Sequence, residues 1–458
     1  MKVIIRADSS SNIGTGHIMR GLVLATQFSD VTFVTRDLHG NINFKINDAG
    51  YKLEMISDNS VVDFGKVVNN ISPDLVIIDN YDIDYTFEKI LKDKYPNVSL
   101  MVLDDTYERH YCDILLNHNI SANEKKYKNL VLENCELRCG SEYTLLRQEF
   151  YDYKVKPKQK NQVPKVFVAM GGADCSNINI SILEVIEEIG GVYVNLVTTI
   201  ANKNLDELRE YCRDKKWVNL HINSIEIARL MHESDFAIVT PSVTVNEVYF
   251  MQLPLITIKT AENQSDIFEY LIKNGYDAVD GLNTGLLKKY IERHKQNVIV
   301  GYDLQDFVDL SQDDSLKILS WRNDPTIRNN MYNREKISVE DHLKFVKSLF
   351  ACTNKKYFVV REYGHDIGVI DFTQIIHGDS LHMGLYAKPN VNGAGKILMN
   401  AIVEYAFKIL KVKKIFAEVF EFNNRAYNLY FRYGFKKIGD KEVNNKKVIC
   451  MVLKNEDR

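Results

Sequence analysis

The sequence has 458 residues, about three times the usual domain length of roughly 150 residues, which excludes a single compact core. Hydrophobic residues make up 45% and charged residues 26%, proportions that exclude a disordered or fibrous protein. The net charge of −3 gives no reason to expect binding to nucleic acid or to a membrane. Residues 301–458 carry 25 Lys and Arg against 20 Asp and Glu, whereas residues 1–300 carry 33 against 41, so two bodies of different character are joined.

No stretch approaches the roughly 18 consecutive apolar residues of a membrane span, and the start MKVIIRADSS is typical of a strand rather than a secretory signal. Seven cysteines without a regular framework fit reduced thiols. Both observations predict a cytoplasmic protein. Cys135 and Cys139 lack a second pair of ligands nearby, which favours a structural role over zinc binding.

The first 290 residues alternate short apolar strands with helical stretches, the pattern of buried parallel sheets. The expected strands are 2–6, 31–35, 74–79 and 98–105, followed by 165–170, 192–199, 218–222, 236–240 and 253–258. The charged segment 142–165 connects the two series. We therefore expect α/β architecture with two Rossmann-like lobes, 1–150 and 151–290, and an active-site cleft between them.

The pattern changes after the charged helix LLKKYIERHKQN. The next expected elements are helices 311–321 and 338–350 and strands 356–361, 366–375 and 380–387, with the short turn EYGHD indicating antiparallel pairing. A Gly-rich turn then opens the helix GKILMNAIVEYAFKIL, and strand KKIFAEVF, helix NNRAYNLYFRY and strand KKVICMVL complete an α+β domain over 300–458.

A polar turn follows the first strand, in RADSSSNIGTGHIMRG. Gly14 and Gly16 permit tight backbone geometry, and apolar residues from Ile18 onward begin a helix, so His17 lies at a helix start. A helix N-terminus favours anions, and a neutral His beside a bound phosphate is reasonable there. The alternative is a capping or packing His.

The second lobe repeats this arrangement after its first strand. Gly171 and Gly172 precede Ala173, Asp174 and Cys175, a turn that can present backbone N–H groups to a diphosphate.

Further along the second lobe, Ser242 and Thr244 are spaced to lie at a helix N-terminus, with Glu247 one turn later. Such a carboxylate can accept both ribose hydroxyls, although a capping box with a solvated Glu fits the spacing equally well. Asn263 and Gln264 precede another helix and are candidates for sugar or phosphate contacts.

The segments DSSSNIGTGHIMR, IIDNY, CDILLN, ELRCGSEYTLLRQEF, MGGAD, SVTVNE and ENQ resemble the UDP-2,4-diacetamido-2,4,6-trideoxy-β-L-altropyranose hydrolase family of pseudaminic acid synthesis, over about residues 1–280. This resemblance implies a glycosyltransferase-B-like fold and hydrolysis at the anomeric carbon with UDP leaving. The family commonly has Asp-His-Tyr where this chain has Asp79, Asn80 and Tyr81.

The resemblance also assigns residues. It implies that His17 is catalytic, that Tyr81 lies in the active site and that UDP binds mainly in the second lobe. The implied substrate-binding residues are Asp8, Gly14, Gly16, Arg20, Tyr81, Gly171, Gly172, Ser242, Thr244, Glu247, Asn263 and Gln264. No metal is expected, because Asp104 and Asp105 at a strand end are more often a turn cap than metal ligands.

The C-terminal domain has its own Gly-rich turn, in MGLYAKPNVNGAGKILMNAIVEYAF. Strand, turn and helix occur in the order that lets backbone N–H groups at 391–396 grip a pyrophosphate. Downstream, Asn423, Ala426, Tyr430 and Gly434-Phe435 follow the pattern Asn-x-x-Ala-x-x-x-Tyr-x-x-x-Gly-Phe.

Together these segments resemble the GCN5-related N-acetyltransferase superfamily over about residues 303–455, with Asn390 where a Gln or Arg usually begins the pyrophosphate loop. The resemblance implies acetyl-CoA as co-substrate, direct attack by an amine and Tyr430 as the acid that protonates the CoA thiolate. The alternative for Tyr430 is a core residue. The implied cofactor-binding residues are Tyr386, Val391, Gly393, Ala394, Gly395, Lys396 and Asn423.

A narrower match involves LSWRNDPTIRNNMYN, KKYFVV, IGVIDF and GLYAKPNVNGAGKILMN, which look like the acetyltransferase of the same pathway. That family acetylates the 4-amino group of UDP-4-amino-4,6-dideoxy-N-acetyl-β-L-altrosamine, and its product is the hydrolase substrate. Glu418 and His382 are candidates for the base. The segment Trp321, Arg322 and Asn323 either borders the sugar pocket or is a buried Trp with capping neighbours.

The sequence thus predicts a bifunctional sugar-nucleotide enzyme that uses a UDP-linked amino sugar and acetyl-CoA, without nucleic acid, membrane or metal. Three alternatives remain open at this point: a UDP-sugar glycosyltransferase, a nucleotide-sensing module that regulates an acetyltransferase, and the equivalent enzyme for another nonulosonic acid. The oligomeric state is open as well.

Overall fold

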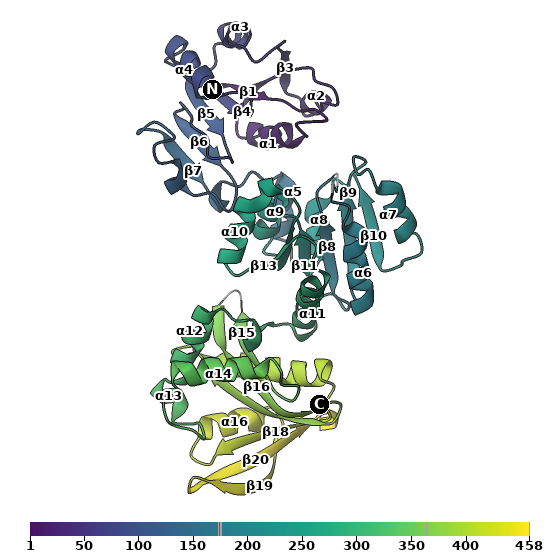
Figure 1. Ribbon diagram of the computed structural model, residues 1–458, viewed down its shortest axis with the longest axis vertical. Coiled ribbons are helices and arrows are strands. Elements are labelled where there is room, and N and C mark those ends of the chain that lie inside the picture. The colour runs from purple at the N-terminus through teal and green to yellow at the C-terminus, as the bar shows by residue number, and fades with distance from the viewer. Residues whose placement is uncertain (173, 175, 363–364, 458) are drawn as a thin grey trace. The chain divides into compact units, whose positions relative to one another are not determined.

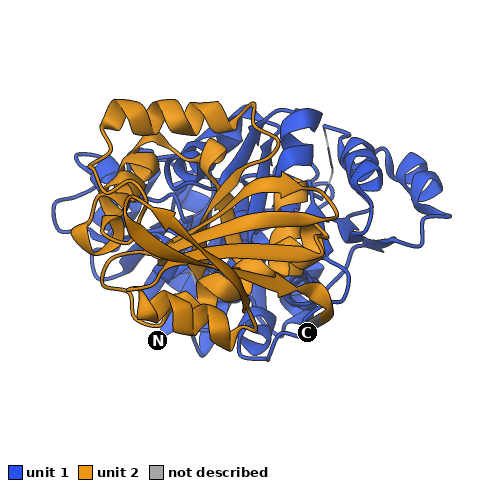
Figure 2. Ribbon diagram, turned by 90° about the horizontal axis from the view of Figure 1, so that it is seen from below, with its two compact units in different colours: residues 1–290 blue, residues 291–458 orange. Residues whose placement is uncertain are grey.

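A computed structural model describes residues 1–172, 174, 176–362 and 365–457. Ala173 and Cys175 of the second Gly-rich turn, and Tyr363 and Gly364 of the expected EYGHD turn, lie outside the described residues. The chain divides into compact units, 1–290 and 291–458 (Figure 2). The division falls within helix α11 (Thr284–Val300), whose last residue packs in the core of the second unit.

The first lobe is a parallel sheet in the order β3-β2-β1-β4-β5-β6-β7 (Figure 1). Ile5 and Ile77 pack with α1 on one face, while Ile4 and Val76 pack with α3 and α4 on the other, as apolar strands buried on both sides predict. The strands are β1 (Lys2–Ala7), β2 (Asp30–Thr35), β3 (Lys52–Met55), β4 (Leu75–Asp79), β5 (Ser99–Leu103), β6 (Ile114–Asn117) and β7 (Glu136–Cys139). The helices are α1 (Gly16–Ala25), α2 (Phe44–Asp48), α3 (Val61–Ile71) and α4 (Tyr85–Lys94).

The second lobe repeats this topology as β10-β9-β8-β11-β12-β13, again parallel. Its strands are β8 (Lys165–Ala169), β9 (Tyr193–Thr198), β10 (Val218–Ile222), β11 (Phe236–Val239), β12 (Leu255–Lys259) and β13 (Asp277–Asp280). Its helices are α5 (Gln148–Lys154), α6 (Asn179–Ile189), α7 (Leu205–Cys212), α8 (Ile227–Glu233), α9 (Val243–Phe250) and α10 (Ser265–Lys273). Phe150 of α5 belongs to this lobe's core, so a boundary at residue 150 would fall inside a helix of the second lobe.

The second unit contains a mixed sheet in the order β14-β15-β16-β17-β18-β20-β19. Its strands are β14 (Asp303–Asp306), β15 (Lys356–Glu362), β16 (His365–Ile376), β17 (Ser380–Ala387), β18 (Lys414–Phe420), β19 (Lys436–Val443) and β20 (Lys446–Lys454). Its helices are α12 (Gln312–Arg322), α13 (Pro325–Arg328), α14 (Val339–Leu349), α15 (Ala394–Glu404) and α16 (Asn424–Arg432). β15, β16 and β17 pair antiparallel, as expected.

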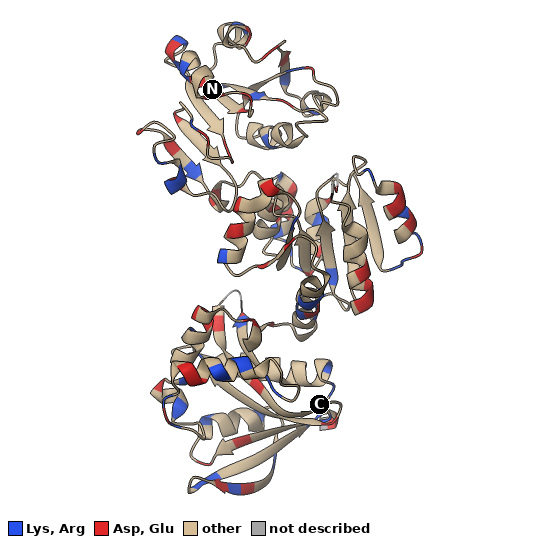
Figure 3. Cartoon of the chain, viewed as in Figure 1, with Lys and Arg blue, Asp and Glu red and all other residues tan. Residues whose placement is uncertain are grey.

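The predicted fold class, two Rossmann-like lobes followed by an α+β domain, is confirmed. Charges of both signs are interspersed along both units, with acidic residues grouped on α6 and α7 (Figure 3). In the part of the chain that the structure describes, no helix combines the length and apolar character that crossing a bilayer requires.

Candidate active sites

The first site lies where the strand order of the first lobe reverses, between β1 and β4. At such a switch point the carboxyl ends of neighbouring strands form the usual ligand crevice of an open α/β sheet. His17, in the first turn of α1, places Nδ1 2.6 Å from Oδ1 of Asp79, the last residue of β4. Arg20, one turn later, donates from Nε and Nη2 to both Asp79 oxygens, at 2.5 and 2.6 Å. The topology thus assembles an imidazole, a guanidinium and a carboxylate.

Asp79 orients His17 because it is a permanent anion. Burial alone would raise its pKa, but the charge of Arg20 and the hydrogen bonds from Arg20 and His17 outweigh burial and lower the pKa of Asp79 to about 2. The carboxylate favours the tautomer in which Nδ1–H of His17 donates to Asp79 and Nε2 is left as an acceptor. His17 is therefore neither the helix cap, a position held by Thr15, nor a simple packing residue.

Tyr81 and Asp105 extend this cluster. The Tyr81 ring meets the His17 ring edge-on at a centroid distance of 4.8 Å, and its hydroxyl donates to Asp105 at 2.7 Å. Arg20 also contacts Asp105, at 3.4 Å. Asp104, in contrast, accepts bonds from Thr106 and Tyr107 of its own turn and from the Tyr127 hydroxyl, so the turn-cap interpretation holds for Asp104 only.

His118 follows β6 and was not predicted from the sequence. Its side chain is buried, and neither ring nitrogen has a hydrogen-bond partner among the described residues. Burial and the charge of Arg20 lower the pKa of His118 to about 4, which keeps the ring neutral at pH 7. The signal available in the sequence was the polar run Asn117-His118-Asn119 after an apolar strand.

Asp8 has a structural role beside the first site, because its carboxylate binds other side chains of the lobe. Its carboxylate accepts bonds from Arg6, Arg36 and Asn80, all at 2.7–2.8 Å. Burial opposes ionisation, but the charge of Arg6 and the hydrogen bonds from Arg6 and Arg36 lower the pKa of Asp8 to about 2. Because both of its oxygens accept hydrogen bonds, Asp8 connects the ends of β1 and β2.

Gly14 lies in the exposed turn before α1, and Gly16 is the exposed first residue of that helix. Gly14 adopts a φ of +85°, and its N–H is already bonded to the Ser10 carbonyl at 2.8 Å. Gly16 opens the helix, and Thr15 provides no side-chain cap. The N–H groups of the first turn therefore remain available to an anion.

The second site lies at the corresponding switch point of the second lobe, between β8 and β11. Gly171 has a φ of +82°, and a Cβ on Gly172 would lie 2.8 Å from the Thr199 side chain, so this turn requires glycine at both positions. Asp174 is buried and accepts a bond from Asn179 at 2.6 Å, which anchors the turn to α6.

Helix α9 begins directly after β11, at the same edge. Ser242 occupies the N-cap position without a capping hydrogen bond, so the capping-box alternative is wrong. Thr244 lies in the first turn and Glu247 one turn later, with 20% of the Glu247 side chain exposed. Burial raises the pKa of Glu247 to about 7, because Arg147 offsets it only weakly from 3.9 Å.

Asn263 and Gln264 follow β12, the next strand of the same edge. The Gln264 side chain closes its own turn by accepting bonds from Thr260 and Ala261. Asn263 is exposed. The structure therefore leaves Asn263, rather than Gln264, available to a ligand.

The two lobes are joined by hydrogen bonds next to these sites. Asn246 of α9 accepts from the backbone N–H of Ile120 and donates to Asn119, both at 3.0 Å. Asn246 precedes Glu247, and Asn119 follows His118. The carboxyl-end residues of both sheets are thus linked through one buried side chain.

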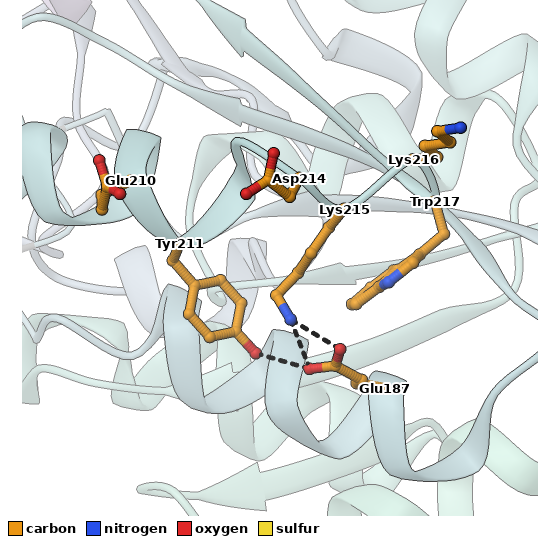
Figure 4. Close-up of a pocket in the computed structure, with 7 residues that line it drawn as sticks. All are labelled: Glu187, Glu210, Tyr211, Asp214, Lys215, Lys216 and Trp217. Carbon is orange, nitrogen blue, oxygen red and sulfur yellow. Dashed lines mark hydrogen bonds and ion pairs between the residues drawn. The ribbon is translucent and has the colours of Figure 1, made fainter.

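A surface pocket of about 670 Å³ lies elsewhere on the second lobe (Figure 4). Glu187, at the end of α6, accepts bonds there from Tyr211 and Lys215. Trp217, also in the lining, immediately precedes β10. The pocket therefore lies at the amino ends of the strands, the opposite edge from the ligand site of such folds.

The third site lies in the second unit, where β17 and β18 diverge. These parallel strands pair only from Ser380 to His382, although β17 continues to Ala387 and β18 to Phe420. Helix α15 follows β17 with Gly393 as an N-cap of φ +76° and no side-chain cap. A Cβ on Gly395 would lie 3.1 Å from Leu429, so this glycine lets α15 approach α16 closely.

The predicted cofactor residues take different places around this site. Val391, Gly393, Ala394, Gly395 and Lys396 form the turn and first helical turn as expected, and Tyr386 lies in β17. The N-terminus of α15 thus offers unbonded N–H groups to a pyrophosphate.

Tyr430 and Asn423 belong to α16 and its cap. Tyr430 packs in the core with Phe435, but no described residue hydrogen-bonds its hydroxyl. Burial raises its pKa, which keeps the phenol protonated. The Asn423 side chain accepts from the N–H of Ala426 as the N-cap of α16, so its oxygen is committed to the helix.

The candidate bases Glu418 and His382 face each other, with His382 Nδ1 3.9 Å from Glu418. Glu418 forms an ion pair with Lys441 at 2.7 Å and accepts from Tyr332. Burial opposes ionisation, but these partners lower the pKa of Glu418. Glu418 is therefore a poor proton acceptor.

The segment Trp321-Arg322-Asn323 closes α12. Trp321 is buried. The Asn323 side chain donates from Nδ2 to the Ile337 carbonyl and accepts at Oδ1 from the Ile337 N–H, so these two residues are structural. Arg322 donates to the Asn333 carbonyl, and its buried Nη1 has no partner in the described part of the chain.

Cys112 and Cys135 place their sulfurs 3.7 Å apart, and the described cysteines are free thiols. In the described ranges, no group of three or more His, Cys, Asp or Glu side chains is arranged to hold a metal ion.

Comparisons with known proteins match both parts. Residues 307–436 match the family described as acetyltransferase (GNAT) domain. The N-terminal part is 35% identical over 277 residues to the UDP-2,4-diacetamido-2,4,6-trideoxy-beta-L-altropyranose hydrolase of Campylobacter jejuni, covering 60% of this chain and 98% of that protein. Over 127 residues the chain is 45% identical to the acetyltransferase PseH of the same species, 28% of this chain and 80% of the relative. The crystal structure of C. jejuni N-acetyltransferase PseH with acetyl coenzyme A is 36% identical, covers 34% of this chain and 99% of that one, and has a TM-score of 0.28.

Proposed function

The chain belongs, through its N-terminal part, to the family of UDP-2,4-diacetamido-2,4,6-trideoxy-β-L-altropyranose hydrolases and, through its C-terminal part, to the acetyltransferase (GNAT) family, and on that premise we propose that it catalyses consecutive steps of pseudaminic acid biosynthesis. Acetyl-CoA acetylates the 4-amino group of UDP-4-amino-4,6-dideoxy-N-acetyl-β-L-altrosamine. Water then hydrolyses the resulting UDP-2,4-diacetamido sugar to free sugar and UDP.

The observation that carries the hydrolase assignment is the cluster of His17, Asp79 and Arg20 at the switch point of the first lobe. With Nδ1–H bonded to Asp79, Nε2 of His17 accepts a proton from water as the water oxygen attacks the anomeric carbon. The bond between that carbon and the β-phosphate oxygen breaks, and its electron pair leaves with UDP. Uncapped N–H groups at helix N-termini stabilise the departing diphosphate.

UDP binding is assigned to residues 151–290. Glu247 accepts the ribose hydroxyls, the Gly171-Gly172 turn and the N-terminus of α9 face the diphosphate, and Asn263 contacts the sugar or phosphate. This assignment is supported by the position of all these residues at the carboxyl ends of β8, β11 and β12.

Hydrolysis is tested by incubating the full-length protein with the UDP-diacetamido sugar and no acceptor. We expect UDP release, and we expect His17→Ala to slow it by about 10²- to 10⁴-fold because the base is lost. His377→Ala, at an exposed His of the second unit, is the matched control and should keep the wild-type rate of UDP release. Release that depends on an added acceptor would instead identify a glycosyltransferase.

Acetyl transfer is assigned to residues 300–458. The α15 N-terminus grips the pyrophosphate of acetyl-CoA, whose acetyl group lies where β17 and β18 diverge. The Tyr430 phenol gives its proton to the CoA thiolate as the carbon–sulfur bond breaks.

The role of Tyr430 predicts a selective defect. Tyr430→Phe should slow acetyl transfer by about 10²-fold or more, because Phe lacks the hydroxyl that protonates the CoA thiolate. Tyr427→Phe, one turn earlier on α16, is the control, and hydrolysis of the pre-acetylated sugar should be unchanged in both variants. An unaltered rate of CoA release in Tyr430→Phe would remove Tyr430 from this role.

We assign the protein to the cytoplasm, where acetyl-CoA and UDP-sugars are available. Fractionation of cells that express it, followed by assays for both activities, tests this compartment, and activity confined to the membrane fraction would contradict it.

A further inference from the structure

Asp371 lies in the middle of β16, and its carboxyl group lies against Gly384 of the neighbouring strand β17. Among the residues that the structure describes, no side chain or backbone group forms a hydrogen bond or ion pair with it, although most carboxylates near the sheet have such partners. Burial raises the pKa of Asp371 to about 7. The residue is nevertheless partly exposed, so its unpaired carboxylate is accessible to a ligand, and such a group suggests a chemical role.

The Asp371 carboxyl group occupies the space that a side chain at position 384 would fill, and this space is open because residue 384 is glycine. Asp371 is paired directly with Gly384 of β17, and a Cβ on Gly384 would lie 2.3 Å from Oδ2 and 2.9 Å from Oδ1 of Asp371. The carboxyl group therefore lies across the backbone of β17. Pairing of β17 with β18 ends at His382, two residues earlier, so the carboxyl reaches the point where the strands diverge.

Asp371 and Tyr430 approach this point from opposite faces of the sheet. Asp371 shares its face with Tyr386, which packs against Trp321 of α12. Tyr430 packs in the core on the other face, together with α15. Burial raises the pKa of Tyr430, and the negative charge of Asp371 raises it further.

The titratable groups around Asp371 are phenols. Its charge acts on Tyr357 of β15, Tyr386 of β17 and Tyr430 of α16, and Arg322 of α12 acts on Tyr386. Glu418, on the same face, is already bound by Lys441 and Tyr332. Asp371 is thus the carboxylate at this site that is free to take a proton.

We propose that Asp371 is the general base of acetyl transfer and deprotonates the 4-ammonium group of the UDP-linked sugar; this inference rests on the proposed function of the second unit. The proton moves from nitrogen to the Asp371 carboxylate, and the nitrogen lone pair attacks the thioester carbon. The carbon–sulfur bond breaks, Tyr430 protonates the sulfur, and the second proton lost from nitrogen restores the phenol. Asp371 returns its proton to solvent.

The test compares wild type, Asp371→Asn and Glu418→Gln as full-length proteins in acetyl transfer across about pH 6 to 9.5. The acceptors are the 4-amino UDP-sugar and spermidine.

We expect Asp371→Asn to lose about 10²- to 10⁴-fold in kcat/KM at pH 7, with an unchanged KM for acetyl-CoA. The deficit should shrink as pH rises, because the amine then loses its proton without help. Glu418→Gln should keep the wild-type pH profile. Stabilisation by acetyl-CoA in thermal unfolding reports whether each variant is folded.

The outcomes separate the two claims. A loss that is equal at every pH, or no loss, would overturn Asp371 as the base. If the wild type acetylates only spermidine, the proposed sugar acceptor is wrong, and the same pH comparison on spermidine decides the role of Asp371. If the wild type acetylates neither amine, both claims fail.

Discussion

The carboxylates of Asp79 and Glu247 both lie at strand carboxyl ends of the first unit, but they differ in charge state. Arg20 and His17 hold Asp79 as an anion, with a pKa of about 2. Burial outweighs the charge of Arg147, 3.9 Å from Glu247, and the resulting pKa of about 7 lets Glu247 titrate near neutrality. The Asp79 carboxylate therefore orients the His17 ring at every physiological pH, while Glu247 gains or loses a proton near neutrality.

The raised pKa of Glu247 predicts that nucleotide binding depends on pH. Protonation removes its ability to accept both ribose hydroxyls, so the affinity for UDP-N-acetylglucosamine should fall up to about tenfold between about pH 8 and pH 6. This probe is chosen because its diphosphate has no titration in that range. Titration calorimetry should show weaker, pH-independent binding for Glu247→Gln. The same pH dependence in wild type and variant would rule out Glu247 as its source.

Glu247 also affects stability, with a definite sign. Its pKa is raised from the usual 4.5 to about 7, so between these values the folded state holds a proton that the unfolded state releases. Its contribution to the free energy of unfolding therefore falls as pH rises from about 4.5 to about 7. Glu247→Gln should flatten this part of the stability–pH curve in denaturant unfolding, and an unflattened curve would argue against the raised pKa.

At the residue scale, what the sequence could predict depended on local context. His17, Arg20 and Tyr81 stand in recognisable segments, and the structure brings them together. Asp79 and Asp105 are 59 and 85 residues from Arg20 in the sequence, so their contacts with Arg20 form only because β4 and β5 end beside α1. Asp371 was missed because its position depends on Gly384, a glycine on the neighbouring strand.

Between elements, α9 and the end of β6 form the clearest link between the lobes. Asn246 satisfies the Ile120 N–H and the Asn119 side chain in a buried setting. Because removal of one partner leaves the others unsatisfied, Asn246→Ala should cost about 1–3 kcal/mol of unfolding free energy. It should also slow UDP release, since α9 carries Glu247.

Asn219→Ala, at an exposed site on β10, is the control for Asn246→Ala. Denaturant unfolding and UDP-release assays measure both effects. Equal stability and rate in the two variants would show that Asn246 does not couple the lobes.

The same scale explains which elements the sequence predicts. Strands such as β1, β4 and β17 were found because continuous apolar residues or clear alternation mark them. The missed strands are short or highly charged: β3, β6, β7, β13, β14 and β19. Their pairing depends on a neighbouring strand rather than on their own pattern.

At the scale of the whole molecule, the length of the chain corresponds to two compact units, and the charge difference between residues 1–300 and 301–458 follows nearly the same division. The proposed product of the second unit is the proposed substrate of the first. One chain would thus supply both activities in equal amounts, whatever the arrangement of the units.

Mass analysis of the products formed from the 4-amino UDP-sugar tests this account most directly. With acetyl-CoA, we predict free 2,4-diacetamido sugar, UDP and CoA from the wild type, and the acetylated UDP-sugar alone from His17→Ala. Without acetyl-CoA, the substrate should remain unchanged. Release of UDP from the unacetylated sugar, or acetylation that is never followed by UDP release in the wild type, would contradict the proposed sequence of reactions.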